Sequence, residues 1–391
     1  MNNDPRRVSS FGLALLAGCI LLGGQAEAQH YTQTNLVSDE PGATVTDANL
    51  VNPWGLARSS TSTWWSANNG SGTATLYNGN TGAPAALIVT IPPAPGGRGP
   101  GSPTGAAFNG TAAFELTPGN PARFLFVTQD GTISGWNPAV DATNALVKVA
   151  SPDAVYTGVA IASRGGAWFL YVANFAKRRI EVFDSSFQRV DAGKHAHFGN
   201  DHHDRDDDCD DDEHDGHRRH SDRFRDERIP RGFAPFNVQN IGGDLYVTFA
   251  KQDPVINVAA GPGLGYVDVF SPSGRLLRRL EHGPWLDAPW GLALAPSDFG
   301  AFSHNLLVGQ FRSGEIAAYD VTTGAFLGKV LKSTGDEAFV AEGLWALGFG
   351  NGGNAGPLNT LFFTAGIEGE SQGLFGTLTA VTAEQIFGNG R

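Results

Sequence analysis

The sequence predicts an all-β protein with the fold of a six-bladed β-propeller, on three observations. A turn rich in Pro, Gly and Trp leads six times into a short apolar strand, and further strands follow each copy. The copies recur roughly every 50 residues, and a repeat of that length made only of strands is typical of propeller blades. With 52 Gly and 22 Pro, the chain is also rich in the residues that join short strands by turns.

The six copies give the blade count. The first strand of each blade is expected within 52–57, 103–108, 156–161, 234–238, 288–293 and 342–347. Second strands are expected at 64–68, 125–129, 170–174, 245–249, 307–311 and 361–365, and third strands have the character of 180–184. The aligned positions Gly55, Gly105, Gly158, Asn237, Gly291 and Trp345 are separated by 50, 53, 79, 54 and 54 residues. Only the third gap exceeds the length of a blade, which indicates an insertion.

The two ends of the chain are expected to share the sixth blade. The last repeat supplies only three strands, ending near residues 374–379, and an unassigned strand lies at 31–37. Pairing that N-terminal strand with the last strand closes the ring and leaves no free sheet edge around it. The alternative, a frayed N-terminal tail, stays open because chain termini are often loose.

Residues 1–28 have the pattern of a signal peptide. Two arginines precede an apolar run that ends in a small-residue cleavage site, and cleavage after Ala28 gives a secreted or periplasmic protein. Residues 29–391 then form a single propeller domain. A second interpretation stays open, because the residues up to Cys19 match a lipoprotein box that would leave the protein lipid-anchored. The apolar run is short for a membrane helix, so no transmembrane span is expected in the mature form.

A charged stretch at about 193–228 is interpreted as a disordered insertion in a surface loop. From His195 to Arg228 it carries 13 Asp or Glu and 6 Arg, a composition that cannot bury a core. Imidazole suits Zn, Ni and Cu, but no fixed spacing marks a site, so only weak metal binding is expected there. The candidate ligands are His195, His197, His202, His203, His214, His217 and His220. No basic stripe is present, so a nucleic-acid partner is not expected.

No catalytic motif stands out. A nucleophile elbow, a His-Glu-x-x-His pair, a phosphate loop and a dinucleotide fingerprint are absent from the sequence. Loops that lead into first strands and loops that join second to third strands lie on one side of the ring, here called the loop face. Residues predicted to face a ligand there are Asn52, Asn237, Asp287 and Glu342. Taken singly, such side chains beside glycine are also typical of turns. The repeated Trp54, Trp290 and Trp345 are interpreted as packing residues.

The repeats resemble a known pattern. Pro289–Ala293 (PWGLA), Leu170–Asn174 (LYVAN) and Arg179–Asp184 (RIEVFD) look like strands of NHL-repeat propellers. The whole mature chain, with Asn49–Ala57 near its start, is similar to an uncharacterised family of exported bacterial six-bladed propellers. The wider superfamily includes calcium-dependent lactonases, which hold the metal in the channel with a Glu, two Asn and an Asp. No motif here matches that set, so those roles are not carried over.

Two functional hypotheses follow. The first is an exported binding module without catalysis, which takes a protein, a glycan or a small-molecule ligand on the loop face; it is favoured because no nucleophile or general base stands out. The alternative is a metal-dependent ester or lactone hydrolase with a divalent cation in the central channel. There the cation would polarise a carbonyl group and lower the pKa of bound water. Of the two hypotheses, only the second calls for a cofactor, the divalent cation.

Overall fold

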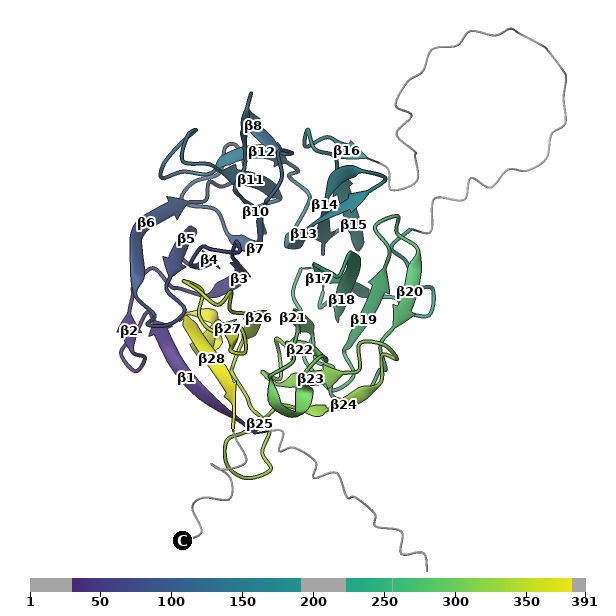
Figure 1. The fold of residues 1–391 in the computed structure, drawn as a ribbon. Coiled ribbons are helices and arrows are strands. Elements are labelled where there is room, and N and C mark those ends of the chain that lie inside the picture. Colours follow the sequence, from purple (N-terminus) through teal and green to yellow (C-terminus); the bar gives the residue numbers. More distant parts are fainter. Residues whose placement is uncertain (1–29, 191–222, 255, 382–391) are drawn as a thin grey trace, which may run out of the picture.

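The computed structural model describes residues 30–190, 223–254 and 256–381, and it confirms the six-bladed propeller (Figure 1). Six sheets stand radially around a central axis, each with the first strand of its repeat innermost. Hydrophobic clusters between adjacent blades form the core. In one of them, Leu125 and Val127 of the second blade meet Leu170 and Val172 of the third.

The strands of the blades have the following bounds. Blade one holds β3 (Pro53–Ala57), β4 (Trp64–Asn68), β5 (Thr73–Tyr77) and β6 (Pro84–Thr90), and blade two holds β7 (Pro103–Phe108), β10 (Phe124–Thr128), β11 (Thr132–Trp136) and β12 (Leu146–Ala150). Blade three holds β13 (Tyr156–Arg164), β14 (Ala167–Asn174), β15 (Arg179–Phe183) and β16 (Arg189–Val190), and blade four holds β17 (Phe233–Ile241), β18 (Asp244–Lys251), β19 (Gly265–Phe270) and β20 (Leu276–Arg279). Blade five holds β21 (Pro289–Leu294), β22 (Leu306–Gln310), β23 (Ile316–Tyr319) and β24 (Phe326–Lys329), and blade six holds β26 (Leu344–Phe349), β27 (Leu361–Ala365), β28 (Leu374–Ala380) and β1 (His30–Ser38).

The remaining elements are short and lie outside the four strands of each blade. Strands β2 (Val45–Thr46) and β25 (Leu331–Lys332) pair with β1, and β8 (Glu115–Thr117) pairs with β9 (Asn120–Pro121). The helices of the described ranges are η1 (Gly300–Phe302) and α1 (Ile367–Glu370). Neither approaches the length and apolar character that a membrane crossing requires.

The prediction that the two ends of the chain close the ring is confirmed. Strand β1 pairs antiparallel with β28, beginning with Tyr31 opposite Ala380. The side chains of Tyr31 and Val37 are buried, and the Tyr31 hydroxyl donates a hydrogen bond of 2.9 Å to the carbonyl oxygen of Phe299 in blade five. The N-terminal strand therefore completes blade six and also ties it to its neighbour.

The innermost strands meet at small residues. Each of them contacts the innermost strands of both neighbouring blades. A Cβ atom at Gly55 would lie 2.5 Å from the carbonyl oxygen of Thr104, and one at Gly291 would lie 2.4 Å from that of Trp345. These close backbone approaches explain why glycine recurs in the repeat. The strand registers place Ala346 at the equivalent position of blade six, one residue after the position predicted from the spacing.

The last six residues of the predicted insertion belong to the described structure. Residues 223–228, predicted as the end of the insertion, pack against blade four: Phe224 is buried, and its amide donates a hydrogen bond of 2.9 Å to the carbonyl oxygen of Gly274. Gly274 lies in the turn between β19 and β20, on the side opposite the loop face. The described anchor of this stretch is therefore not on the loop face. The predicted signal peptide and the seven candidate histidines lie outside the described residues.

A buried ion cluster fixes this anchor to blade four. Asp226 forms ion pairs with Arg228, at 3.3 Å, and with Arg279, whose Nε atom also lies 3.3 Å from Oδ1 of Asp268. The Asp268 side chain is fully buried. Burial raises its pKa to about 7, and the negative charge of Asp226 adds to the rise, although Arg279 acts against it. Ionising Asp268 therefore costs free energy in the folded protein.

Stability is expected to fall as this carboxyl group ionises. The folded protein holds a proton on Asp268 up to a pKa of about 7, whereas the unfolded chain releases it near the ordinary value of 3.8. Between these values the folded state binds more protons, so the free energy of unfolding should decrease as pH rises, by at most about 1.4 kcal/mol per pH unit. Urea unfolding at pH 4.5 and 7.5 measures this change. In Asp268→Asn the decrease should be smaller by on the order of 2 kcal/mol, and an equal pH dependence in both proteins would contradict the assignment.

Candidate functional site

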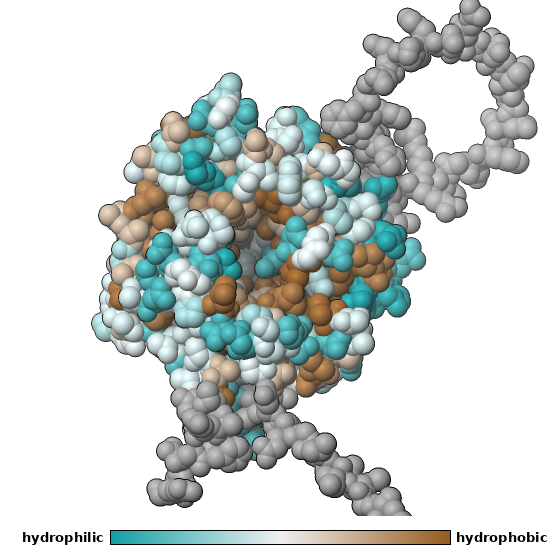
Figure 2. Space-filling view, viewed as in Figure 1, coloured by the Kyte–Doolittle hydropathy of each residue, from teal (hydrophilic) through white to brown (hydrophobic). Residues whose placement is uncertain are grey.

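A cavity occupies the axis of the ring. It has a volume of about 470 Å³ and is lined mainly by the second halves of the six innermost strands. Because these strands start at the loop face, the cavity lies toward the opposite side, where each innermost strand turns into the second strand of its blade. We call that side the cavity face. Figure 2 shows a hollow at the centre of the ring, bordered in part by hydrophobic residues.

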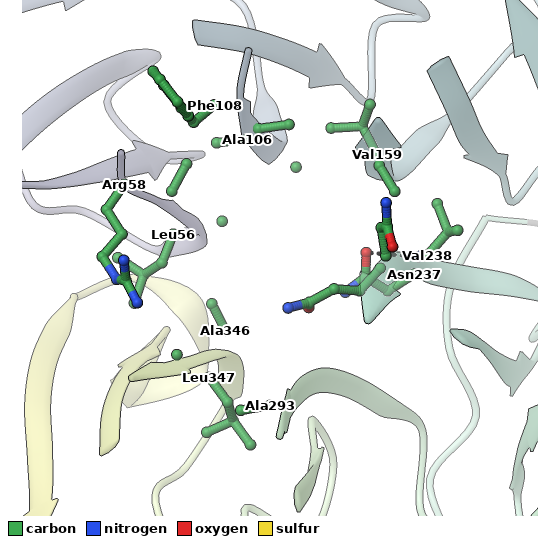
Figure 3. Close-up of a pocket in the computed structure, with 18 of the residues that line it drawn as sticks. Leu56, Arg58, Ala106, Phe108, Val159, Asn237, Val238, Ala293, Ala346 and Leu347 are labelled. Atoms are coloured by element: carbon green, nitrogen blue, oxygen red, sulfur yellow. Dashed lines mark hydrogen bonds between the residues drawn. The ribbon is translucent and has the colours of Figure 1, made fainter. Parts of the chain in front are cut away.

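The walls of the cavity combine apolar side chains with polar atoms, and the polar atoms make up the larger part of its surface. Each blade contributes at least one apolar side chain, and from blade one to blade six these include Leu56, Ala106, Val159, Val238, Ala293 and Leu347 (Figure 3). Phe108 and Leu294 also line the cavity, with 37% and 43% of their surfaces exposed. Its polar side chains are Arg58, Asn237, Gln239 and Asn240. Among the described residues, the lining includes no carboxylate, imidazole, thiol or hydroxyl group.

Arg58 is the one charged side chain in this lining. It follows β3 directly, and its guanidinium group donates hydrogen bonds to the carbonyl oxygens of Phe349 (2.7 Å) and Gly350 (3.1 Å) in blade six. It also lies over the ring of Trp64, 5.5 Å from the centroid. These partners are neutral, and none of the ion pairs within the described ranges includes Arg58. Burial lowers the pKa of Arg58 from its ordinary value.

Three amide side chains line the cavity from blade four. Asn237 is buried, and its Nδ2 donates a hydrogen bond of 2.9 Å to the carbonyl oxygen of Trp290, so it links blades four and five. Asn240 Nδ2 donates to the carbonyl oxygen of Ile161 at 2.8 Å, which links blades three and four. Gln239 is half-buried, and its side-chain amide forms no hydrogen bond among the described residues. Of the three, Gln239 is the one free to meet a ligand.

Aromatic side chains close the axis toward the loop face. Six of them form one buried cluster, here called the aromatic plug: Trp54, Phe175, Phe236, Trp290, Phe311 and Trp345. The ring of Trp345 stacks on that of Trp54, with centroids 3.5 Å apart, and on that of Phe311, at 4.0 Å. The interpretation of the repeated tryptophans as packing residues is confirmed. The cavity is consequently blind at this end.

Two of the predicted ligand-facing residues come together on one loop. Asn52 is buried, and its Nδ2 donates a hydrogen bond of 3.1 Å to Oε2 of Glu370. Oε1 of Glu342 accepts a hydrogen bond of 2.9 Å from the amide of Gly369. The loop that holds these partners contains three consecutive residues with left-handed φ, at 368–370. Burial raises the pKa of Glu370. Asn52 and Glu342 thus support a strained loop on the loop face.

The other two predicted residues lie apart from this loop and from each other. Oδ1 of Asp287 accepts a hydrogen bond of 2.8 Å from the amide of Gly261, and burial raises the pKa of Asp287. Asn237 lies inside the ring and lines the cavity. The four side chains therefore do not converge on a single site. Within the described ranges, no three His, Cys, Asp or Glu side chains are grouped so that they could hold a metal ion.

The sequence did not single out Arg58 or Gln239. Arg58 directly follows the innermost strand of blade one, and Gln239 lies in the second half of that of blade four. Neither residue is part of a motif. One signal was available: each follows the aromatic-small pair of its repeat, Trp54-Gly55 or Phe236-Asn237, by the few residues that carry the strand to the cavity face.

No family model matches the sequence. The uncharacterized protein L690 of Acanthamoeba polyphaga mimivirus is 30% identical over 343 residues, which cover 85% of this chain and 81% of that protein. The uncharacterized protein R648 of the same virus is 30% identical over 387 residues, which cover 96% and 86%. Both relatives are viral, so they do not support the bacterial source that the resemblance suggested. A solved streptogramin B lyase structure aligns with a TM-score of 0.48 and 10% identity over 90% of this chain and 98% of that one, and a likeness this distant carries no argument about chemistry.

Proposed function

We propose that this chain, which belongs to one family with the uncharacterized mimivirus proteins L690 and R648, is a binding module without catalysis whose central cavity takes a small molecule with an apolar body. The observation that carries the proposal is the cavity of about 470 Å³, to which all six blades contribute apolar side chains and two blades contribute polar ones. A cavity of that size fits the usual volume of small-molecule sites, which are mostly apolar with a few polar groups that orient the ligand.

The chemistry of the lining favours binding over hydrolysis. A hydrolase needs a nucleophile or an activated water, and a general base to take its proton. The described lining offers only a guanidinium group and amides as polar side chains, and none of these is a base near neutral pH. On the loop face, the predicted oxygen ligands are already used in hydrogen bonds that hold loops.

The proposal is tested with N-phenyl-1-naphthylamine, an uncharged aromatic probe whose fluorescence rises in apolar surroundings. With about 17 non-hydrogen atoms and roughly 0.4 kcal/mol per atom, the probe should bind with a Kd on the order of 10 μM. Ala106→Phe fills part of the cavity and should weaken binding about tenfold or more. Leu294→Asp places a charge at an exposed wall residue, where the fold tolerates it, and should weaken binding as well.

Glu342→Ala is the control, because it alters the loop face and should leave the Kd within about twofold. Melting temperatures of all variants show that each is folded. If wild-type protein failed to bind the probe, or if Glu342→Ala abolished binding while Ala106→Phe left it unchanged, the cavity would not be the site.

A further inference from the structure

We propose that the ligand of this cavity is an amphipathic organic monoanion, with its negative group on Arg58 and its apolar body along the walls that the six blades form. This inference rests on the proposed function and adds the chemical class of the ligand. It starts from a charge in the cavity that the described protein does not neutralise.

Arg58 is suited to bind an anion. A guanidinium group has five N–H donors, and the short hydrogen bonds to Phe349 and Gly350 use two of them, while a longer one of 3.4 Å reaches the carbonyl oxygen of Ser59. Donors therefore remain for a ligand. The two short hydrogen bonds tie the side chain to blade six, so that it is held in place before a ligand arrives. A negative group beside it would supply the counter-charge that its neutral partners do not, in surroundings where charge-assisted hydrogen bonds are strong.

The opposite wall supplies neutral polar groups. Gln239 and Asn240 belong to blade four, which stands across the ring from blade one and Arg58. Figure 3 shows Arg58 and Asn237 on opposite sides of the cavity, with the apolar side chains of the other blades between them. A ligand that spans the cavity thus meets a cation at one end, apolar walls along its body and an amide at the other end.

The balance of charge limits the ligand to a single negative group. The described lining has one cation and no second basic residue, so a diphosphate or a dicarboxylate would leave at least one negative charge without a basic partner. An uncharged ligand would leave the positive charge of Arg58 without a counter-charge, as in the free protein. A fatty or aromatic carboxylate, or a sulfonate of similar shape, satisfies both the charge and the walls.

The test compares two probes that differ in one charged group. 8-Anilinonaphthalene-1-sulfonate carries a sulfonate that N-phenyl-1-naphthylamine lacks, and we expect wild-type protein to bind the anionic probe about tenfold more tightly. Arg58→Gln should remove most of this preference, because it should weaken binding of the anionic probe far more than binding of the neutral probe. Arg58→Lys should keep part of it. Decanoate should displace the bound anionic probe at concentrations where decanol does not.

A second variant tests the same inference without changing Arg58, whose replacement by Gln could also disturb the structure. Gln239→Glu changes a side chain with no hydrogen-bond partner among the described residues, so the fold should be unaffected. The new carboxylate should weaken binding of the anionic probe at least threefold more than binding of the neutral probe. If Arg58→Gln weakened both probes equally, or if wild-type protein bound both alike, the inference of an anionic ligand would be overturned while the cavity remained a binding site. Failure of the neutral probe to bind wild-type protein would instead overturn the proposed function.

Discussion

Removal of strand β1, residues 30–38, is expected to lower the free energy of unfolding by on the order of 5 kcal/mol or to prevent cooperative folding altogether. The strand buries Tyr31, Leu36 and Val37, and each such side chain contributes roughly 1.5 to 3 kcal/mol when it leaves water. It also covers the hydrogen-bonding edge of β28, which would otherwise face solvent at the outside of blade six. A loss of this size is comparable to the whole stability of many domains. Urea unfolding followed by circular dichroism measures it.

Two point variants on the same strand separate closure from a general effect of truncation. Val37→Asp places a charge at a fully buried position and should cost about 3 kcal/mol or more, whereas Thr34→Asp lies on the exposed part of the strand and should change stability by less than about 0.5 kcal/mol. A truncated protein that melts at the wild-type temperature would show that the ring does not depend on β1.

The second large effect is expected at the centre of the aromatic plug. Trp345→Ala should lower the free energy of unfolding by about 3 to 5 kcal/mol, since it removes a fully buried ring that stacks on Trp54 and Phe311 and leaves a cavity behind. Its indole Nε1 also donates a hydrogen bond of 3.2 Å to Oδ1 of Asn52. Thermal and urea unfolding of the variant measure the loss.

Trp345→Phe and Trp168→Ala are the matched controls. Trp345→Phe keeps an aromatic ring in the stack and loses the hydrogen bond to Asn52, so about 1 to 2 kcal/mol is expected. Trp168 is 39% exposed, and its replacement by Ala should cost less than about 1 kcal/mol. Equal losses for Trp345→Ala and Trp168→Ala would mean that the plug does not hold the blades together.

The fold could be predicted from the sequence because every blade packs its first strand against the first strands of the two neighbouring blades, so the residues that make this contact recur along the chain. Four of the six first strands carry a glycine where neighbouring backbones meet, as at Gly55 and Gly291, and the recurrence of this glycine at the spacing of a blade is visible in the sequence. The closing strand could be predicted by elimination, since blade six lacked a fourth strand. The end of the insertion could not, because Phe224 and Asp226 look like part of a charged loop until Gly274 and Arg279 are brought beside them.

The position of the cavity could not be predicted from the sequence. Whether the axis is open or filled at a given height depends on six side chains that come from six distant segments. At the height of Trp54 four of the six are aromatic, and they meet and fill the axis; the other two are Thr104 and Thr157. Two positions further along, five of the six strands carry aliphatic side chains that line the cavity, namely Leu56, Ala106, Val159, Val238 and Leu347. Polar residues near glycines suggested a site on the loop face, whereas the structure places three of the four in loop-supporting contacts there and Asn237 in the cavity.

The aromatic plug also restricts the shape of a molecule that can be recognised. Because the axis is sealed behind the cavity, a linear polymer cannot thread through the ring, and a glycan or a peptide could insert only a chain end or a side branch. A bound molecule must leave by the route through which it came.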